Sequence, residues 1–144
     1  MRNDVIRTLF TLAAGIGVGV ASMAAAQNQR GTVTPIAERD IIEKLDGKEM
    51  KETVVEVTLE AGQGGAPHRH PGPVFGYVLE GEYELGLDNQ PSRVLKAGAT
   101  FYEPTGGLHR VSKNPAATGK TRVLAVVLYP RDAKQVAIPE PKKE

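Results

Sequence analysis

Short stretches of alternating apolar and polar residues, separated by Gly and Pro, recur along this chain. In residues 52–60, ETVVEVTLE, the side chains of Val55, Val57 and Leu59 fall on one face, as in a half-buried strand. Residues 122–129 form the strongest strand pattern, and shorter ones cover 93–96, 99–103 and 108–112. Strands repeating about every 8–12 residues with turns between them are typical of an antiparallel sandwich or barrel. The pattern therefore predicts an all-β fold.

Three further segments carry weaker patterns. Residues 74–88, VFGYVLE-G-EYELGLD, are predicted to form a hairpin with Gly81 at its turn. Residues 27–40 are polar and are predicted to be irregular, with Pro35 as a breaker, and 41–45 fit either a short strand or a helical turn. The chain after Pro130 is rich in Pro and charge, which predicts a frayed end.

Composition agrees with a small β domain and excludes several kinds of site. The 144 residues include 16 Gly and 10 Pro but only 5% aromatic residues, which indicates many turns around an aliphatic core. The length is that of one domain. Because there is no Cys, a disulfide framework, a thiolate zinc site and a cysteine nucleophile are excluded.

The first 26 residues have the features of an export signal. Arg2 and Arg7 precede an apolar run, and the small residues Ala24 and Ala26 form an A-x-A cleavage pattern. The apolar run is short and rich in Gly and Ala compared with the roughly 20 residues of a membrane span. We therefore expect cleavage after Ala26, no stable membrane anchor afterwards, and a periplasmic or secreted product.

Charge argues against one class of partner. Residues 1–26 carry Arg2, Arg7 and Asp4, so their removal takes the formal net charge from +1 to zero. Without a basic stripe nothing indicates nucleic acid as a partner. The expected organisation is a signal peptide over 1–26, an N-terminal arm over 27–47, a β-barrel over 48–130 and a flexible C-terminal tail over 131–144.

The three histidines are spaced like metal ligands. In His68-Arg69-His70 the two imidazoles lie at i and i+2, so in an extended segment both leave the same face. His109 follows at the start of another predicted strand, and a third nitrogen from there would complete a facial ligand set. Three unrelated surface histidines are the alternative for such a motif on its own.

The sequence around these histidines closely resembles the two motifs of the cupin superfamily. Gly62, His68, His70 and Gly81 match the first motif, G-x5-H-x-H-x3-4-E-x6-G, and the second, G-x5-P-x-G-x2-H-x3-N, is matched by Gly98, Pro104, Gly106 and His109. The resemblance spans residues 62–114. It implies a double-stranded β-helix, a jelly-roll barrel whose mouth holds a divalent metal ion, here Fe, Mn, Cu or Zn.

Two positions depart from the family pattern. Val74 stands where the first motif has glutamate, and Lys113 stands where the second has asparagine, with Asn114 one residue later. Counting by twos from His68 places Val74 and Val78 on the inward face, where both are expected to line the pocket. Three interpretations are open. Three neutral histidines hold the metal, as in some cupin oxygenases; a carboxylate such as Glu103 substitutes; or the metal site has decayed into a small-ligand pocket.

Two functions from different classes fit this site. The first is a metal-dependent, dioxygenase-like enzyme acting on a small anionic substrate, because an ion held by neutral ligands keeps its charge and attracts anions. The second is a non-catalytic module that binds or senses a small ligand or a metal. In either case the expected partners are a small molecule and a second copy of the chain, since a small barrel can cover its strand edges by dimerising.

Overall fold

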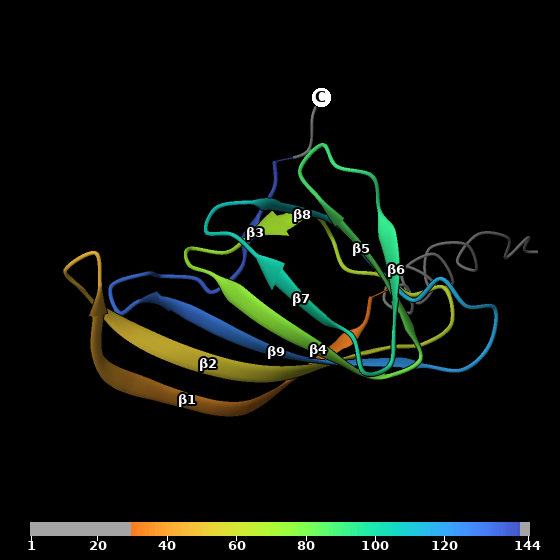
Figure 1. The fold of residues 1–144 in the computed structure, drawn as a ribbon, viewed down its shortest axis with the longest axis horizontal. Helices are drawn as coiled ribbons and strands as arrows, with labels where there is room; N and C mark the ends of the chain where they lie inside the picture. Colours follow the sequence, from red (N-terminus) through yellow and green to blue (C-terminus); the bar gives the residue numbers. More distant parts are fainter. Residues whose placement is uncertain (1–29, 142–144) are drawn as a thin grey trace, which may run out of the picture.

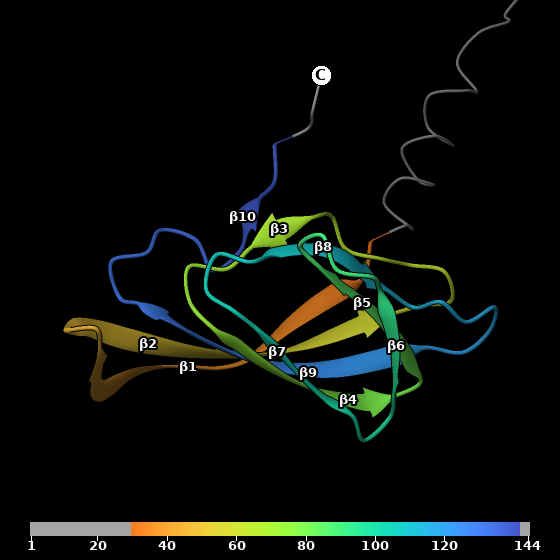
Figure 2. The same ribbon diagram turned by 45° about the horizontal axis from the view of Figure 1, so that its top comes forward.

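The computed structural model describes residues 30–141, which form two antiparallel β-sheets and no helix. The predicted signal peptide lies outside the described residues. None of the described residues forms a helix of the length and apolarity needed to cross a bilayer. The all-β prediction is confirmed, and the two sheets lie as facing layers (Figure 1 and Figure 2).

The first sheet has the order β1-β2-β9-β4-β7 and forms the larger layer. Its long strands alternate inward and outward side chains, so β4 buries every second residue from Val74 to Val78 and exposes Phe75 and Tyr77. The strands are β1 (Thr32–Leu45), β2 (Lys48–Leu59), β9 (Thr121–Pro130), β4 (Val74–Glu80) and β7 (Thr100–Glu103).

The second sheet has the order β10-β3-β8-β5-β6. Two of its strands are only two residues long: β3 lies beside β8, and β10 lies beside β3 at the edge of the sheet (Figure 2). The strands are β10 (Ile138–Pro139), β3 (His68–Arg69), β8 (Leu108–Lys113), β5 (Glu82–Leu87) and β6 (Arg93–Lys96).

Apolar side chains from both sheets fill the space between the layers. The main cluster includes Leu59, Val78, Leu85 and Val123, all nearly inaccessible to solvent. Gly76 belongs to this packing because the Phe101 ring lies where its Cβ would be, 2.0 Å from the nearest ring carbon. Burial of these aliphatic side chains is the main stabilising contribution available to a domain without disulfides.

The predicted hairpin over 74–88 is wrong. β4 pairs with β7 and β9, whereas β5 pairs with β6 and β8, so the chain changes sheets at Gly81 instead of folding back. Gly81 has a φ of 76°, and a Cβ there would lie 2.3 Å from the Lys120 carbonyl oxygen. The glycine is needed for a corner between sheets, and this gives the same sequence signal as a tight turn.

The prediction of irregular chain over 27–40 is also wrong where the structure describes it. Residues from Thr32 onward form β1, which pairs with β2 along the edge of the first sheet. The register shifts between Pro35 and Ala37, and such an irregularity on an edge strand accommodates a proline. Because nearly all of β1 is exposed on both faces, it carries no apolar alternation that sequence could have revealed.

The C-terminal segment returns to the barrel instead of fraying after Pro130. Ile138 and Pro139 pair with Arg69 and His68, and Ala133 and Val136 pack against the buried side chains of Val74, Val127 and Tyr129. Arg69 also donates hydrogen bonds of 2.9 and 3.1 Å to the Glu140 carboxylate. We call residues 131–141 the C-terminal strap. Residues 142–144 lie outside the described part.

Candidate metal centre

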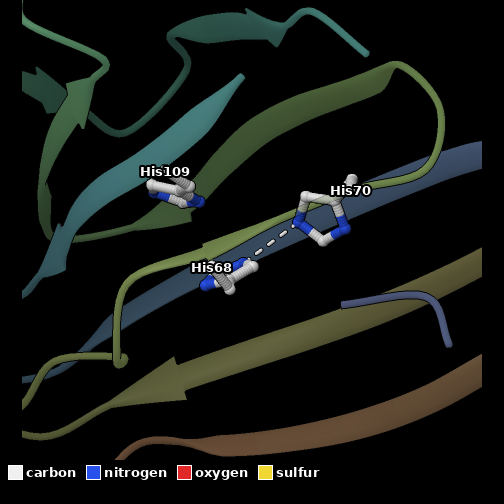
Figure 3. Close-up of side chains that lie close together, drawn as sticks. All are labelled: His68, His70 and His109. Atoms are coloured by element: carbon white, nitrogen blue, oxygen red, sulfur yellow. Dashed lines mark hydrogen bonds between the residues drawn. The ribbon is translucent and has the colours of Figure 1, made fainter. Parts of the chain in front are cut away.

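Strand pairing brings the three histidines together. His68 on β3 lies directly opposite His109 on β8, and their ring centroids are 5.0 Å apart. His70 follows β3 on the same face as His68, as the i, i+2 spacing predicts. One ring nitrogen from each histidine lies within 4.8 Å of the others, so the three are positioned to hold a metal ion (Figure 3).

Two backbone carbonyls fix the tautomers of the first two histidines. His68 Nδ1 is 2.8 Å from the Ala66 carbonyl oxygen, and His70 Nδ1 is 2.6 Å from that of Val136 on the C-terminal strap. A carbonyl oxygen can only accept, so each Nδ1 carries the proton and each neutral ring presents an Nε2 lone pair. This is the arrangement that orients metal-ligating imidazoles in proteins.

The two Nε2 atoms face each other at 3.0 Å (Figure 3). A hydrogen bond between them would require one ring to be cationic, but burial lowers the pKa of both His68 and His70 below the usual histidine value. Two ligands about 2.1 Å from one ion and about 90° apart are themselves about 3.0 Å apart. The pair therefore fits a metal ion, and its neutral state at neutral pH is the one that binds metal.

Glu103 on β7 brings a carboxylate into the same place. It is 3% exposed, with Oε1 3.2 Å from His109 Nδ1 and Oε2 3.8 Å from His70 Nε2. Neither Glu103 Oε2 nor His109 Nδ1 forms a hydrogen bond, although both are buried. Buried polar atoms without partners are uncommon, and an ion or a water bound there is a common explanation. A metal ion bound by the histidines would meet this need.

A cavity of about 390 Å³ opens onto these polar groups and extends between the sheets. Its walls are mostly aliphatic and aromatic side chains, with Val74 among them, and no Lys or Arg occurs among the described residues that line it. The size lies at the low end of the range for small-molecule sites, roughly 300–1,000 Å³. Val78, expected to line the pocket, is instead fully buried in the main apolar cluster.

Tyr83 on β5 lines the described cavity. Its hydroxyl lies 2.9 Å from Ser112 Oγ and 3.3 Å from His109 Nε2. Burial raises the pKa of Tyr83 well above its usual value, so the hydroxyl stays protonated. Tyr77 and Tyr102 are exposed on the outer face of the first sheet.

A one-residue shift in β8 explains the displaced asparagine. Gly86 pairs with Val111, but the next residue, Leu87, pairs with His109, so Arg110 is an extra residue in β8. Such a bulge turns the side chains that follow it to the opposite face. Ser112 and Asn114 are therefore buried, whereas Lys113 is exposed. Asn114 thus occupies the interior position that uninterrupted alternation would have given to Lys113.

An antiparallel two-sheet barrel with a three-histidine cluster at an internal cavity defines the class of protein as a jelly-roll barrel with a candidate mononuclear metal site. The cupin domain model matches residues 55–127, so the chain belongs to the cupin domain family. No curated protein matches the sequence.

Solved structures with the same fold are distant in sequence. An RmlC-like cupin protein from Desulfovibrio desulfuricans is 22% identical, with a TM-score of 0.53 over 85% of this chain and 96% of that one. A double-stranded β-helix protein from Klebsiella pneumoniae is 24% identical, with a TM-score of 0.51 over 74% and 86%. An oxalate oxidase is 23% identical, with a TM-score of 0.56 over 76% of this chain and 55% of its own. At these identities the likeness shows the fold, a double-stranded β-helix.

Proposed function

We propose that this cupin is a metal-dependent oxygenase acting on a small anionic substrate. The observation that carries the proposal is the pair of Nε2 lone pairs held 3.0 Å apart at the edge of a largely apolar cavity. His68, His70 and His109 would hold a divalent ion, which supplies Lewis acidity and, if it is iron, manganese or copper, redox chemistry with dioxygen. The resemblance to an oxalate oxidase structure supports oxygen chemistry only as an analogy of fold.

The cavity indicates the form of the substrate. Since no Lys or Arg lines its described part, a negative charge on the substrate finds its partner only at the metal site. The aliphatic walls then receive an uncharged, apolar body and exclude water. The neutral Tyr83 hydroxyl is the hydrogen-bond donor available beside His109. A chelating enolate, carboxylate or thiolate with a small apolar group meets these conditions.

The test has two stages. The full chain is produced in a secreting host, and its metals are measured by elemental analysis beside His68→Ala, His70→Ala and His109→Ala. Oxygen uptake is then followed with β-diketone, hydroxycarboxylate and thiol probes, oxalate included. A redox metal that each variant loses, and oxygen uptake with at least one probe, are expected. Unchanged metal content in all three variants would reject the site.

A non-catalytic binding or sensing function is the second candidate. It is favoured by the largely apolar lining of the cavity, which suits the binding of a small ligand. Outside the cytoplasm, raw affinity also favours copper and zinc over iron and manganese. Zinc lost in the histidine variants, with tight ligand binding and no oxygen uptake, is the result that would select this function.

We also propose that the protein is exported and forms a homodimer. The A-x-A pattern ending at Ala26 supports cleavage, so the mature protein should begin at Gln27 by mass spectrometry. β1 lies at the edge of the first sheet with nearly all of its residues exposed, which leaves an edge that a second copy could cover. An uncleaved chain, or a monomeric mass by light scattering, would contradict the corresponding part.

A further inference from the structure

We infer that Glu103 is the fourth metal ligand, supplied from β7 in place of the glutamate that the family motif has at position 74. The inference rests on the metal site proposed above. It adds to that site a charged ligand from a strand that the family motif does not use for this purpose. Four observations about the described residues support it.

The first observation is the position of Glu103 relative to Val74. β4 and β7 are antiparallel neighbours, and Val74 pairs directly with Glu103. Side chains of directly paired residues leave the same face, with their Cβ atoms about 4.5–5.5 Å apart. Both side chains are buried, and both line the cavity. The carboxylate is therefore displaced by one strand but still enters the same part of the barrel.

The second observation is the burial of the carboxyl group. The Glu103 side chain is 4% exposed, and its Oε2 atom neither donates nor accepts a hydrogen bond. This oxygen therefore lacks an acceptor if it carries a proton and lacks a donor if it does not. An ionised carboxylate in such surroundings is stable only beside a positive charge. No Lys or Arg lines the described cavity, so a metal ion is the candidate for that charge.

The third observation is the set of distances around the carboxylate. Two atoms each about 2.1 Å from one ion cannot be more than about 4.2 Å apart. The His68–His70 Nε2 distance of 3.0 Å, the Glu103 Oε1–His109 Nδ1 distance of 3.2 Å and the Glu103 Oε2–His70 Nε2 distance of 3.8 Å meet this condition. The three histidine nitrogens lie within 4.8 Å of one another, so they would close slightly around an ion. Glu103 thus lies close enough to two of the three histidines to share their ion.

The fourth observation separates a ligand from an outer hydrogen-bond partner. An outer carboxylate orients a ligating histidine by accepting its second N–H, as the Ala66 and Val136 carbonyls do for His68 and His70. His109 Nδ1 lies 3.2 Å from Glu103 Oε1 but makes no hydrogen bond. His109 Nδ1 and Glu103 Oε2 are both buried without a hydrogen-bond partner, which is the arrangement expected where one ion would bind both residues.

A carboxylate ligand changes the charge of the site. It offsets one of the two charges of a divalent ion, so one monoanionic chelator makes the site neutral. A second negative charge on the substrate would find no Lys or Arg in the described cavity. The inference therefore narrows the proposed substrate from small anions in general to monoanionic chelators.

The experiment transfers the carboxylate from position 103 on β7 to position 74 on β4, where the family motif has it. Zn²⁺ affinity is measured by competition with a chelator for the wild-type chain, Glu103→Val, Val74→Glu and the double variant Val74→Glu/Glu103→Val. Glu43→Gln, on exposed edge strand β1, is the matched control. Far-UV circular dichroism verifies that each variant is folded, and the Cu²⁺-loaded proteins are compared by electron paramagnetic resonance (EPR).

We expect Zn²⁺ affinity to fall in Glu103→Val and to be restored in the double variant. Glu103→Val should weaken Zn²⁺ binding more than about 100-fold, beyond the roughly 10–100-fold cost of removing an outer partner. The double variant should return to within about tenfold of wild type, and Glu43→Gln should bind like wild type. Glu103→Val should also change the Cu²⁺ EPR spectrum, because one oxygen ligand is replaced.

Three results would overturn the inference that Glu103 is a metal ligand. Binding by Glu103→Val within about 100-fold of wild type, with an unchanged Cu²⁺ spectrum, would make Glu103 a positioning residue and overturn the inference while leaving the three-histidine site intact. A folded double variant that does not regain affinity would overturn it as well. A wild-type chain that binds no Zn²⁺ or Cu²⁺ would overturn both this inference and the proposed metal site.

Discussion

Strand β8 places a buried polar side chain at each end, and the two differ in how their hydrogen bonds are met. Beyond its last residue, the Asn114 amide donates to the Leu59 and Gly119 carbonyl oxygens, both at 3.1 Å, and accepts from the Ala116 backbone N–H at 3.0 Å. Near its first residue, His109 Nδ1 makes no hydrogen bond, and neither does Oε2 of the neighbouring Glu103. Both groups are almost inaccessible to solvent.

The difference separates a structural polar group from a functional one. Asn114 is complete within the folded chain, so its contribution is to stability. At the His109 end the buried polar atoms have no partner in the described chain, and on the proposed function an added ion would supply it. The comparison predicts opposite responses to substitution and to metal at the two ends of one strand.

The largest effect on stability is expected at the complete end. Asn114→Ala removes three hydrogen bonds and leaves buried backbone groups unpaired, each costing about 1–3 kcal/mol. The free energy of unfolding in urea, measured with a chelator present, should fall by about 3 kcal/mol. Metal affinity of the folded variant should not change. A loss below about 1 kcal/mol would remove the contrast.

Metal should act only on the incomplete end. A ligand present at about 100 times its dissociation constant stabilises the native state by about 2.7 kcal/mol. Thermal or urea unfolding with and without Zn²⁺ should show a gain of this size in wild type and in Asn114→Ala. His70→Ala should show none. Equal stabilisation of His70→Ala would mean that the ion binds elsewhere.

The C-terminal strap should have a smaller influence on the same site. Ending the chain after Lys134 removes the Val136 carbonyl that accepts from His70 Nδ1 and the β10 pairing of β3. Loss of such an outer partner costs roughly 10–100-fold in metal affinity, and about tenfold is expected here, or about 1.4 kcal/mol. Chelator competition measures it. Unchanged affinity would show that the strap is not needed to orient His70.

The smallest expected effect is a change in the free energy of unfolding on replacing Glu103, and its sign distinguishes a metal ligand from a structural partner. In the metal-free protein, Glu103→Leu replaces a buried carboxylate without a counter-charge by an apolar side chain in an apolar wall. Stability should rise by about 1 kcal/mol, opposite to Asn114→Ala, because such replacements are often neutral or stabilising. The matched Glu43→Gln change on exposed β1 should stay within about 0.5 kcal/mol. Marked destabilisation by Glu103→Leu would mean that the carboxylate is a structural partner.

Much of this organisation could be predicted from sequence because motif spacing and alternation are local signals. The strand predicted at 93–96 is observed as β6, and the one at 122–129 lies within β9. The histidine spacing correctly placed three imidazoles together. Alternation does not reveal which strands will pair, and for that reason the sequence predicts a hairpin where the chain changes sheets at Gly81.

Three features of the site could not be predicted from the sequence, again because local patterns do not determine them. Phe101 and Tyr102 are adjacent aromatics, so alternation could not show which of them, and hence whether Glu103, faces inward. The Arg110 bulge has no glycine to announce it, although the displaced Asn114 was its trace in the sequence. The contact of the C-terminal strap with His70 could not be predicted from the sequence, because Val136 accepts the hydrogen bond through its backbone carbonyl, which any residue provides.

The most direct test of the account is the metal content of the secreted full chain compared with His70→Ala and Glu43→Gln. Elemental analysis should find about one equivalent of a divalent metal in wild type and in the Glu43→Gln control, and almost none in His70→Ala. The same metal content in all three proteins, or none in any of them, would contradict the central claim that His68, His70 and His109 form a metal centre.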